Sequence, residues 1–149
     1  MSTPTSAAGA LRSSTPAGRF APPAWNAAVV DERRWPLVRV SIGDPGQAGE
    51  MVAGLERILA REARFGLIVN GPADVAGLQR LLAAAPGARR RLRQLRPALG
   101  TWCAGAAHVM DPCDVVDPIW PAEVIWGCAA EAVGSSAAAT AWLRARLLR

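Results

Sequence analysis

The feature that most constrains this chain is a repeated change between two hydrophobic periods, one suited to strands and one to helices. The run WPLVRVSI at residues 35–42 alternates between two faces, as a half-buried strand does. Residues 47–63 instead place Met51 and Leu55 on one face of a helix. The run FGLIV at residues 65–69 is short and continuously apolar, which favours a strand buried on both faces.

The same alternation continues to the end of the chain. We expect further strands at residues 26–32, 102–110 and 123–128, and a polar turn at residues 31–34. We expect further helices from Asp74, at 88–99 after the Pro86-Gly87 interruption, as a short helix or turn at 113–120, and from Ser135 or Ser136.

The predicted order is β-β-α-β-α-β-α-β-α, which defines an α/β protein with a mixed sheet and a mainly parallel centre. A chain of 149 residues suits one domain. Residues 1–24 are rich in Ser, Thr, Ala, Pro and Gly, a composition that predicts a disordered N-terminal tail. We therefore expect a single small domain at residues 25–149.

Composition excludes several classes of protein. Hydrophobic residues make up 51% of the chain, enough for a core, but no uninterrupted apolar stretch is long enough for a membrane span. The net charge of +5 is moderate, and all 17 basic residues are arginine. No secretory signal precedes the three cysteines, so a cytoplasmic location is expected.

The order of elements resembles that of the STAS/SpoIIAA-like superfamily, and most closely the bacterial proteins described as STAS/SEC14-like. The resemblance covers about residues 29–148 and includes a final helix with an Ala-Trp-Leu step at residues 141–143. The segments that carry it are WPLVRVSI, FGLIVNGPA, CAGAAHVMD, and the ending EVIWGCA…SSAAATAWLRARL. It implies a regulatory or protein-interaction module, with a small-ligand or lipid-binding domain of the same fold as the alternative.

One departure from the family pattern concerns its phosphorylation switch. In anti-sigma-factor antagonists of this fold, a serine begins the helix after the central strand. Here residues 70–77 read NGPADVAG and contain neither Ser nor Thr. The resemblance therefore implies an interaction module without the phosphorylatable serine. Asp74 could mimic a charge there, although capping of the helix explains it equally well.

The residue types needed for metal or acid–base chemistry are present but poorly spaced. Cys103, His108, Cys113 and Cys128 lack the close cysteine pair that zinc sites use, so packing is the favoured interpretation. The carboxylates of Asp111, Asp114 and Asp117 could hold a divalent cation, but turn and cap chemistry explains them better. We expect no catalytic residue, metal or cofactor.

An arginine cluster is the strongest charged feature, and it consists of Arg89, Arg90, Arg91, Arg93 and Arg96. It predicts a solvated helix face or a surface for an acidic protein partner or a phosphate-bearing ligand. Without an aromatic stacking platform it argues against nucleic acid. Trp120, between two prolines, is a candidate contact residue. The predicted partner-binding residues are Asn70, Gly71, Asp74, Arg89, Arg90, Arg93 and Trp120. The sequence does not decide whether the chain also forms a homo-oligomer.

Overall fold

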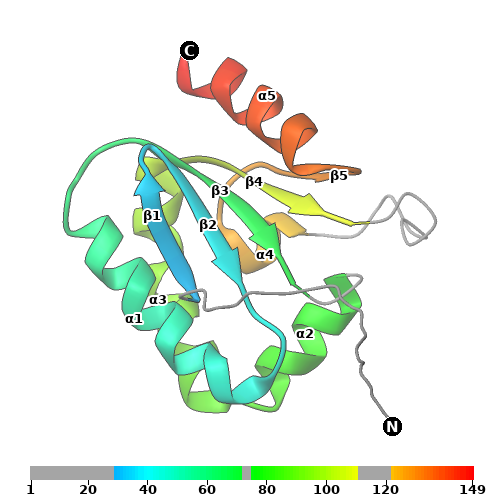
Figure 1. Ribbon diagram of the computed structural model, residues 1–149. Helices are drawn as coiled ribbons and strands as arrows, with labels where there is room; N and C mark the ends of the chain where they lie inside the picture. Colours follow the sequence, from blue (N-terminus) through cyan, green and yellow to red (C-terminus); the bar gives the residue numbers. More distant parts are fainter. Residues whose placement is uncertain (1–28, 72–74, 111–121) are drawn as a thin grey trace, which may run out of the picture.

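The computed structural model describes residues 29–71, 75–110 and 122–149 and folds them as one small α/β domain (Figure 1). The elements in chain order are β1 (Val30–Arg34), β2 (Leu37–Ser41), a 3-10 turn η2 (Pro45–Gln47), α1 (Ala48–Leu59), β3 (Phe65–Asn70), α2 (Val75–Ala83), α3 (Pro86–Trp102), β4 (Cys103–Val109), α4 (Ala122–Trp126), β5 (Ala130–Val133) and α5 (Ser136–Leu147). This confirms the predicted class.

The five strands form one mixed sheet in the order β1-β2-β3-β4-β5. Strand β1 pairs antiparallel with β2, with Val30 opposite Val40, and the three other pairs are parallel. The parallel centre is β3, whose residues are buried up to Val69. Strand β2 buries Val38 and Val40 and leaves Arg39 half-buried, as its alternation predicts.

Helices cover the two faces of the sheet unequally. Strands β2 to β5 follow one another in chain order, so crossovers of one hand place their helices on the same face. Figure 1 shows α1, α2, α3 and α4 on that face and α5 alone on the other. The larger hydrophobic cluster lies under the four helices, and a smaller one, of Ile68, Ala107, Ala139 and Leu143, lies under α5.

The first hairpin differs from the prediction at residues 31–34. These residues are not a turn but belong to β1, and the reversal occurs at Trp35-Pro36. The charged residues at 31–34 suggested a turn, but β1 lies at the edge of the sheet, where a strand can carry charged side chains. Glu32 pairs with Arg57 of α1 and with Arg61 just after that helix, so polar residues are accommodated in a regular strand.

Two further differences from the predictions lie after residue 85. The predicted helix at 88–99 is present as α3 but is longer: it begins at Pro86, which was predicted to interrupt the chain, and continues through Pro97 to Trp102. Pro97 lies on the exposed side, where water can satisfy the carbonyl that proline leaves unpaired. Residues 123–128 are not a strand: α4 ends at Trp126, and β5 comes later. Gly127 has a φ of 75° and donates its N–H to Glu123 O, which closes the helix.

Several predictions lie outside the described residues. They are the tail at 1–24, the start of the domain at 25–28, Asp74, the segment 113–120, the three aspartates at 111, 114 and 117, Cys113 and Trp120. Among the helices that are described, none has the length and apolar character required to cross a membrane.

Candidate functional site

A basic cleft lies between α2, α3 and α4. Its volume is about 610 Å³, within the range of ligand and peptide sites. The described lining residues include four arginines and no acidic side chain. The full set is Ala76, Gln79, Arg80, Leu82 and Ala83 from α2, Arg89, Leu92, Arg93 and Arg96 from α3, and Val124 and Ile125 from α4. We call this surface the arginine cleft.

The spacing of the α3 arginines explains how they share the cleft. Arg89, Arg93 and Arg96 stand at positions i, i+4 and i+7, which lie on one face of a helix. Leu92 and Leu99 are buried beneath that helix and hold it against the core. The positive face is therefore fixed in place by the packing of α3.

The arginines of the cleft differ in what they already bind. Arg96 donates from Nη1 to the carbonyl oxygen of Val124, which ties α3 to α4. The side chains of Arg89 and Arg93 form no hydrogen bond or ion pair with any residue in the described part of the chain. A cleft lined by one sign of charge concentrates its field, so these two guanidinium groups are available to an anionic group.

The cleft also contains exposed apolar surface. The side chain of Val124 is 53% exposed, one of only two large hydrophobic residues so exposed among those described. Leu82, Leu92 and Ile125 are buried next to it. The cleft thus combines an apolar floor with a basic rim, a combination that suits a ligand with both apolar and acidic groups.

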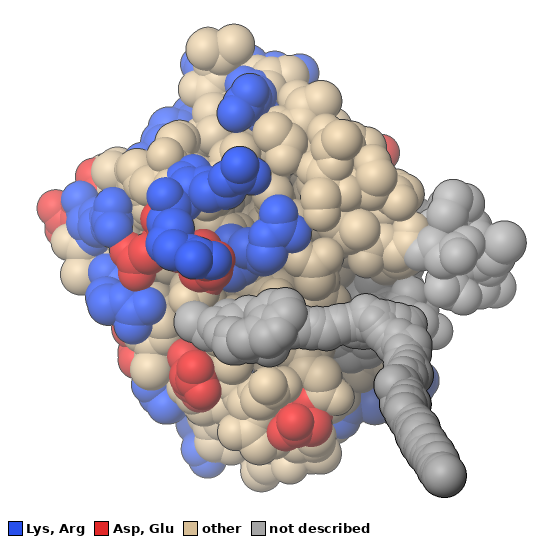
Figure 2. Space-filling view, viewed as in Figure 1, with Lys and Arg blue, Asp and Glu red and all other residues tan. Residues whose placement is uncertain are grey.

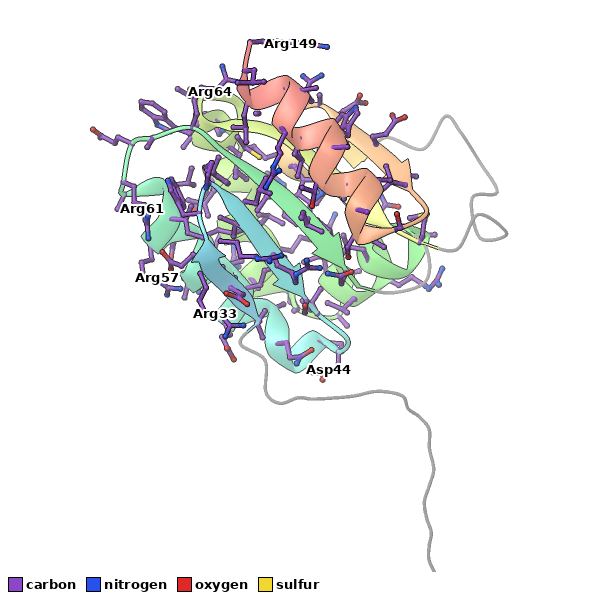
Figure 3. The ribbon with its side chains drawn as sticks, turned by 45° about the horizontal axis from the view of Figure 1, so that its top comes forward. Arg33, Asp44, Arg57, Arg61, Arg64 and Arg149 are labelled. Atoms are coloured by element: carbon purple, nitrogen blue, oxygen red, sulfur yellow. The ribbon has the colours of Figure 1, made fainter. Side chains whose placement is uncertain are left out.

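The arginines at the β1–α1 edge are arranged differently. Figures 2 and 3 show basic side chains of β1 and α1 gathered at this edge, with acidic side chains among them. Arg33 pairs with Asp31 at 2.7 Å, and Arg57 and Arg61 both pair with Glu32. These charges largely cancel, so the edge is less suited than the arginine cleft to an acidic partner.

A second, more open recess lies at the carboxyl ends of β2, β3 and β4. It has a volume of about 570 Å³ and is lined mostly by polar groups and backbone, including Ser41, Asn70 and Gly71. The loop after β2 is held in shape because Gln47 Oε1 accepts hydrogen bonds from Gly43 N at 2.7 Å and Asp44 N at 3.2 Å. We call this surface the carboxyl-edge recess.

His108 is a packed core residue. Its side chain is 4% exposed, and Nε2 accepts a 2.8 Å hydrogen bond from Nε1 of Trp126, which is fully buried. Burial lowers the pKa of His108 to about 4, so the imidazole is neutral at pH 7. This arrangement agrees with packing, the interpretation favoured for His108 from the sequence.

The predicted partner-binding residues fall on two separate surfaces. Asn70 and Gly71 line the carboxyl-edge recess, and Arg89 and Arg93 line the arginine cleft. Arg90 is exposed on α3 but is not a lining residue. Asp74 and Trp120 are outside the described residues. In the described part of the chain, no three His, Cys, Asp or Glu residues are grouped as metal ligands would be.

Arg96 belongs to the arginine cluster that the sequence singles out, and its i, i+4, i+7 spacing with Arg89 and Arg93 places it on the same face of α3. Sequence reasoning missed Arg80 and Val124 as members of the cleft. Arg80 and Val124 join the cleft only through tertiary packing. Comparison of the chain with protein-family models, with curated proteins and with solved structures found no match.

Proposed function

We propose that this chain is a non-enzymatic regulatory or protein-interaction module of the STAS/SpoIIAA-like type, and that it binds an acidic segment of a protein partner in the arginine cleft. The observation that carries the proposal is that the guanidinium groups of Arg89 and Arg93 have no partner among the described residues and lie beside exposed apolar surface. The family resemblance of the sequence supports the same class of function, in a bacterial cytoplasm.

The chemistry of the cleft favours a protein segment over nucleic acid. Guanidinium groups bind carboxylates in a planar, two-pronged geometry, and an amphipathic acidic helix also offers apolar residues to Val124. Nucleic acid binds through phosphate contacts supported by aromatic stacking, and the described lining of the cleft contains no aromatic residue.

The carboxyl-edge recess supports a second candidate function, the binding of a small ligand. Parallel α/β sheets commonly bind ligands beyond the carboxyl ends of their strands. The recess has the volume for one and presents Ser41, Asn70 and the backbone of Gly71 as polar contacts. Bound small molecules released on denaturation of the purified protein, and lost with Asn70→Ala, would favour this function.

Charge reversal in the cleft tests the proposed function. We expect the wild-type chain to capture a stoichiometric protein partner from native lysate, and the Arg89→Glu, Arg93→Glu double variant to lose it. The loss follows from replacing two attractive contacts by repulsion of an acidic segment. Quantitative mass spectrometry of the captured proteins measures the effect, and rising salt is expected to weaken capture by the wild type.

The control is Arg90→Glu with Arg144→Glu, which makes the same change in charge at exposed sites outside the cleft. This variant is expected to keep the partner. Equal loss in both double variants would show that net charge alone governs binding. Capture of small molecules without any stoichiometric protein would contradict the interaction module.

A further inference from the structure

The end of α3 and the turn after α4 lie in close backbone contact. A Cβ added at Gly100 would come within 2.9 Å of Gly127 O, and one added at Gly127 would come within 2.7 Å of Arg96 O. Glycine at both positions therefore permits an approach that larger residues would block. This approach brings two segments together just before Cys103 and Cys128.

Cys103 and Cys128 lie on neighbouring segments beyond this contact. Ala106 N donates to Ala129 O at 2.9 Å, which aligns the segment of Cys128 with the start of β4, and each thiol shifts the pKa of the other. The Cys103 thiol donates to Gly105 O at 3.2 Å. Cys103 is buried at the start of β4, whereas Cys128 is half-buried and packs against the same core from the segment leading to β5. Both are free thiols. Cys128 is therefore accessible to small reagents, whereas the neighbouring Cys103 is shielded from them.

A guanidinium group stands near this pair. Arg146 of α5 donates from Nε to Ala104 O at 2.6 Å, and its Cζ lies 5.0 Å from the centre of the Trp142 ring. The neighbouring Cys103 thiol and the charge of Arg146 lower the pKa of the Cys128 thiol. The neighbouring Cys128 thiol and burial raise the pKa of Cys103. Cys128 is thus the better nucleophile of the two.

We propose that Cys128 and Cys103 form a redox modification site, in which a hydroperoxide oxidises Cys128 and Cys103 then closes an intramolecular disulfide with it. The inference rests on the alignment of the Cys128 segment with β4, on the close approach at Gly100 and Gly127, and on the neighbouring Arg146, and it does not depend on the proposed function. The disulfide links the end of α3 to the segment after α4, two of the three helices that form the arginine cleft.

The reaction balances with hydrogen peroxide as the oxidant. The Cys128 thiolate attacks one peroxide oxygen, the O–O bond breaks, and the product is a sulfenic acid plus hydroxide, which takes up a proton to give water. The Cys103 sulfur then attacks the Cys128 sulfur and displaces the hydroxyl, which leaves as water with the Cys103 proton. In sum, two thiols and one peroxide yield one disulfide and two waters.

The test exposes the reduced, full-length wild-type chain to hydrogen peroxide and then blocks remaining thiols with iodoacetamide. Peptide mapping is expected to find Cys103 joined to Cys128, with both restored as thiols by dithiothreitol. Cys113→Ser, the matched control, is expected to form the same bond. Recovery of both cysteines as alkylated thiols, or pairing of Cys128 with Cys113, would overturn the proposal.

Three single variants separate the roles of the residues. Cys103→Ser is expected to stop at a sulfenic acid on Cys128 that dimedone traps, and Cys128→Ser to leave the shielded Cys103 reduced. Arg146→Gln is expected to slow oxidation of Cys128 several-fold, whereas Arg144→Gln on the exposed side of α5 has no effect. If Cys103 were oxidised as fast in Cys128→Ser as in wild type, the assigned order of attack would be wrong.

Discussion

Nε2 of His108 accepts its hydrogen bond from Trp126 only in the neutral state of the imidazole. Burial lowers the pKa of His108 from 6.5 to about 4, so the unfolded chain takes up a proton at a higher pH than the folded one does. The free energy of unfolding therefore falls as pH falls below 6.5, and the loss is complete below about pH 4.

The first prediction is the size of this pH effect. We expect His108 to account for a loss of about 3 kcal/mol in the free energy of unfolding between pH 6.5 and 4. His108→Gln keeps an acceptor for Trp126 but does not titrate, so its stability should depend less on pH across this window. Urea unfolding at a series of pH values measures both. Parallel pH profiles for the two proteins would contradict the prediction.

The second prediction concerns the donor of the same hydrogen bond. Trp126→Phe leaves Nε2 of His108 without this partner in the core, and we expect a loss of about 2 kcal/mol in the free energy of unfolding. In a His108→Leu background the same change should cost less, because the acceptor has been removed. A double-mutant cycle by chemical denaturation measures the coupling, and a coupling energy near zero would refute this account.

Among the helices and strands, β1 packs closely against α1 because residue 54 of α1 is a glycine and has no side chain. A Cβ on Gly54 would lie 2.6 Å from Cγ2 and 2.7 Å from Cβ of Val30, a branched residue in a strand that has little room to yield. Gly49, in the same helix, has no atom within 4 Å of an added Cβ. Substituting alanine at these two positions of α1 therefore compares a site where packing opposes the gain in helix propensity with a site where it does not.

The third prediction follows from this pair. We expect Gly54→Ala to lower the free energy of unfolding by about 1 to 2 kcal/mol, since the overlap with Val30 outweighs the gain in helix propensity. Gly49→Ala should instead raise it by about 0.5 kcal/mol. Thermal unfolding of both variants beside wild type measures the signs. Stabilisation by Gly54→Ala would show that β1 moves freely over α1.

Some of the helices and strands can be predicted from their own hydrophobic pattern, and others cannot. The alternation in β2 and the amphipathic spacing in α1 predict their own structure because each buries one regular face. The segment 123–128 misleads because Val124 and Ile125 favour strands, while the decisive residue is Gly127, whose positive φ ends a helix. Charged residues in β1 mislead because edge strands accept them when a neighbour such as α1 supplies partners.

The candidate site is less predictable than the fold. The spacing of Arg89 and Arg93 places them on one face of α3, but nothing local says which face meets α2 and α4. The pairing of Arg91 with Glu56 of α1 on the other side of the helix depends on tertiary contact. Cys103 and Cys128 likewise come onto neighbouring segments through tertiary contact, in the pairing of β4 with the chain before β5.

At the scale of the whole molecule, the two faces of the sheet differ in how firmly they are covered. Helix α5 lies alone on its face, where its residues Ala139 and Leu143 form a buried cluster with Ile68 and Ala107, and Trp142 packs against that cluster partly exposed. Beyond that cluster, the Ser135 cap and the hydrogen bond from Arg146 to Ala104 hold the helix in place. The other face buries a much larger cluster under α1 to α4.

The last prediction is that α5 opens before the rest of the domain. Local unfolding follows the amount of buried apolar contact, so native-state hydrogen exchange should give the amides of α5 a lower opening free energy than those of α1 and β3. Leu143→Ala should lower the free energy of the α5 opening by about 2 to 4 kcal/mol, because Leu143 is fully buried against Gly66. Leu148→Ala is the matched control, since Leu148 is 89% exposed. If the amides of α5 exchanged only through global unfolding, the helices on both faces of the sheet would unfold as a single cooperative unit, and the prediction would be wrong.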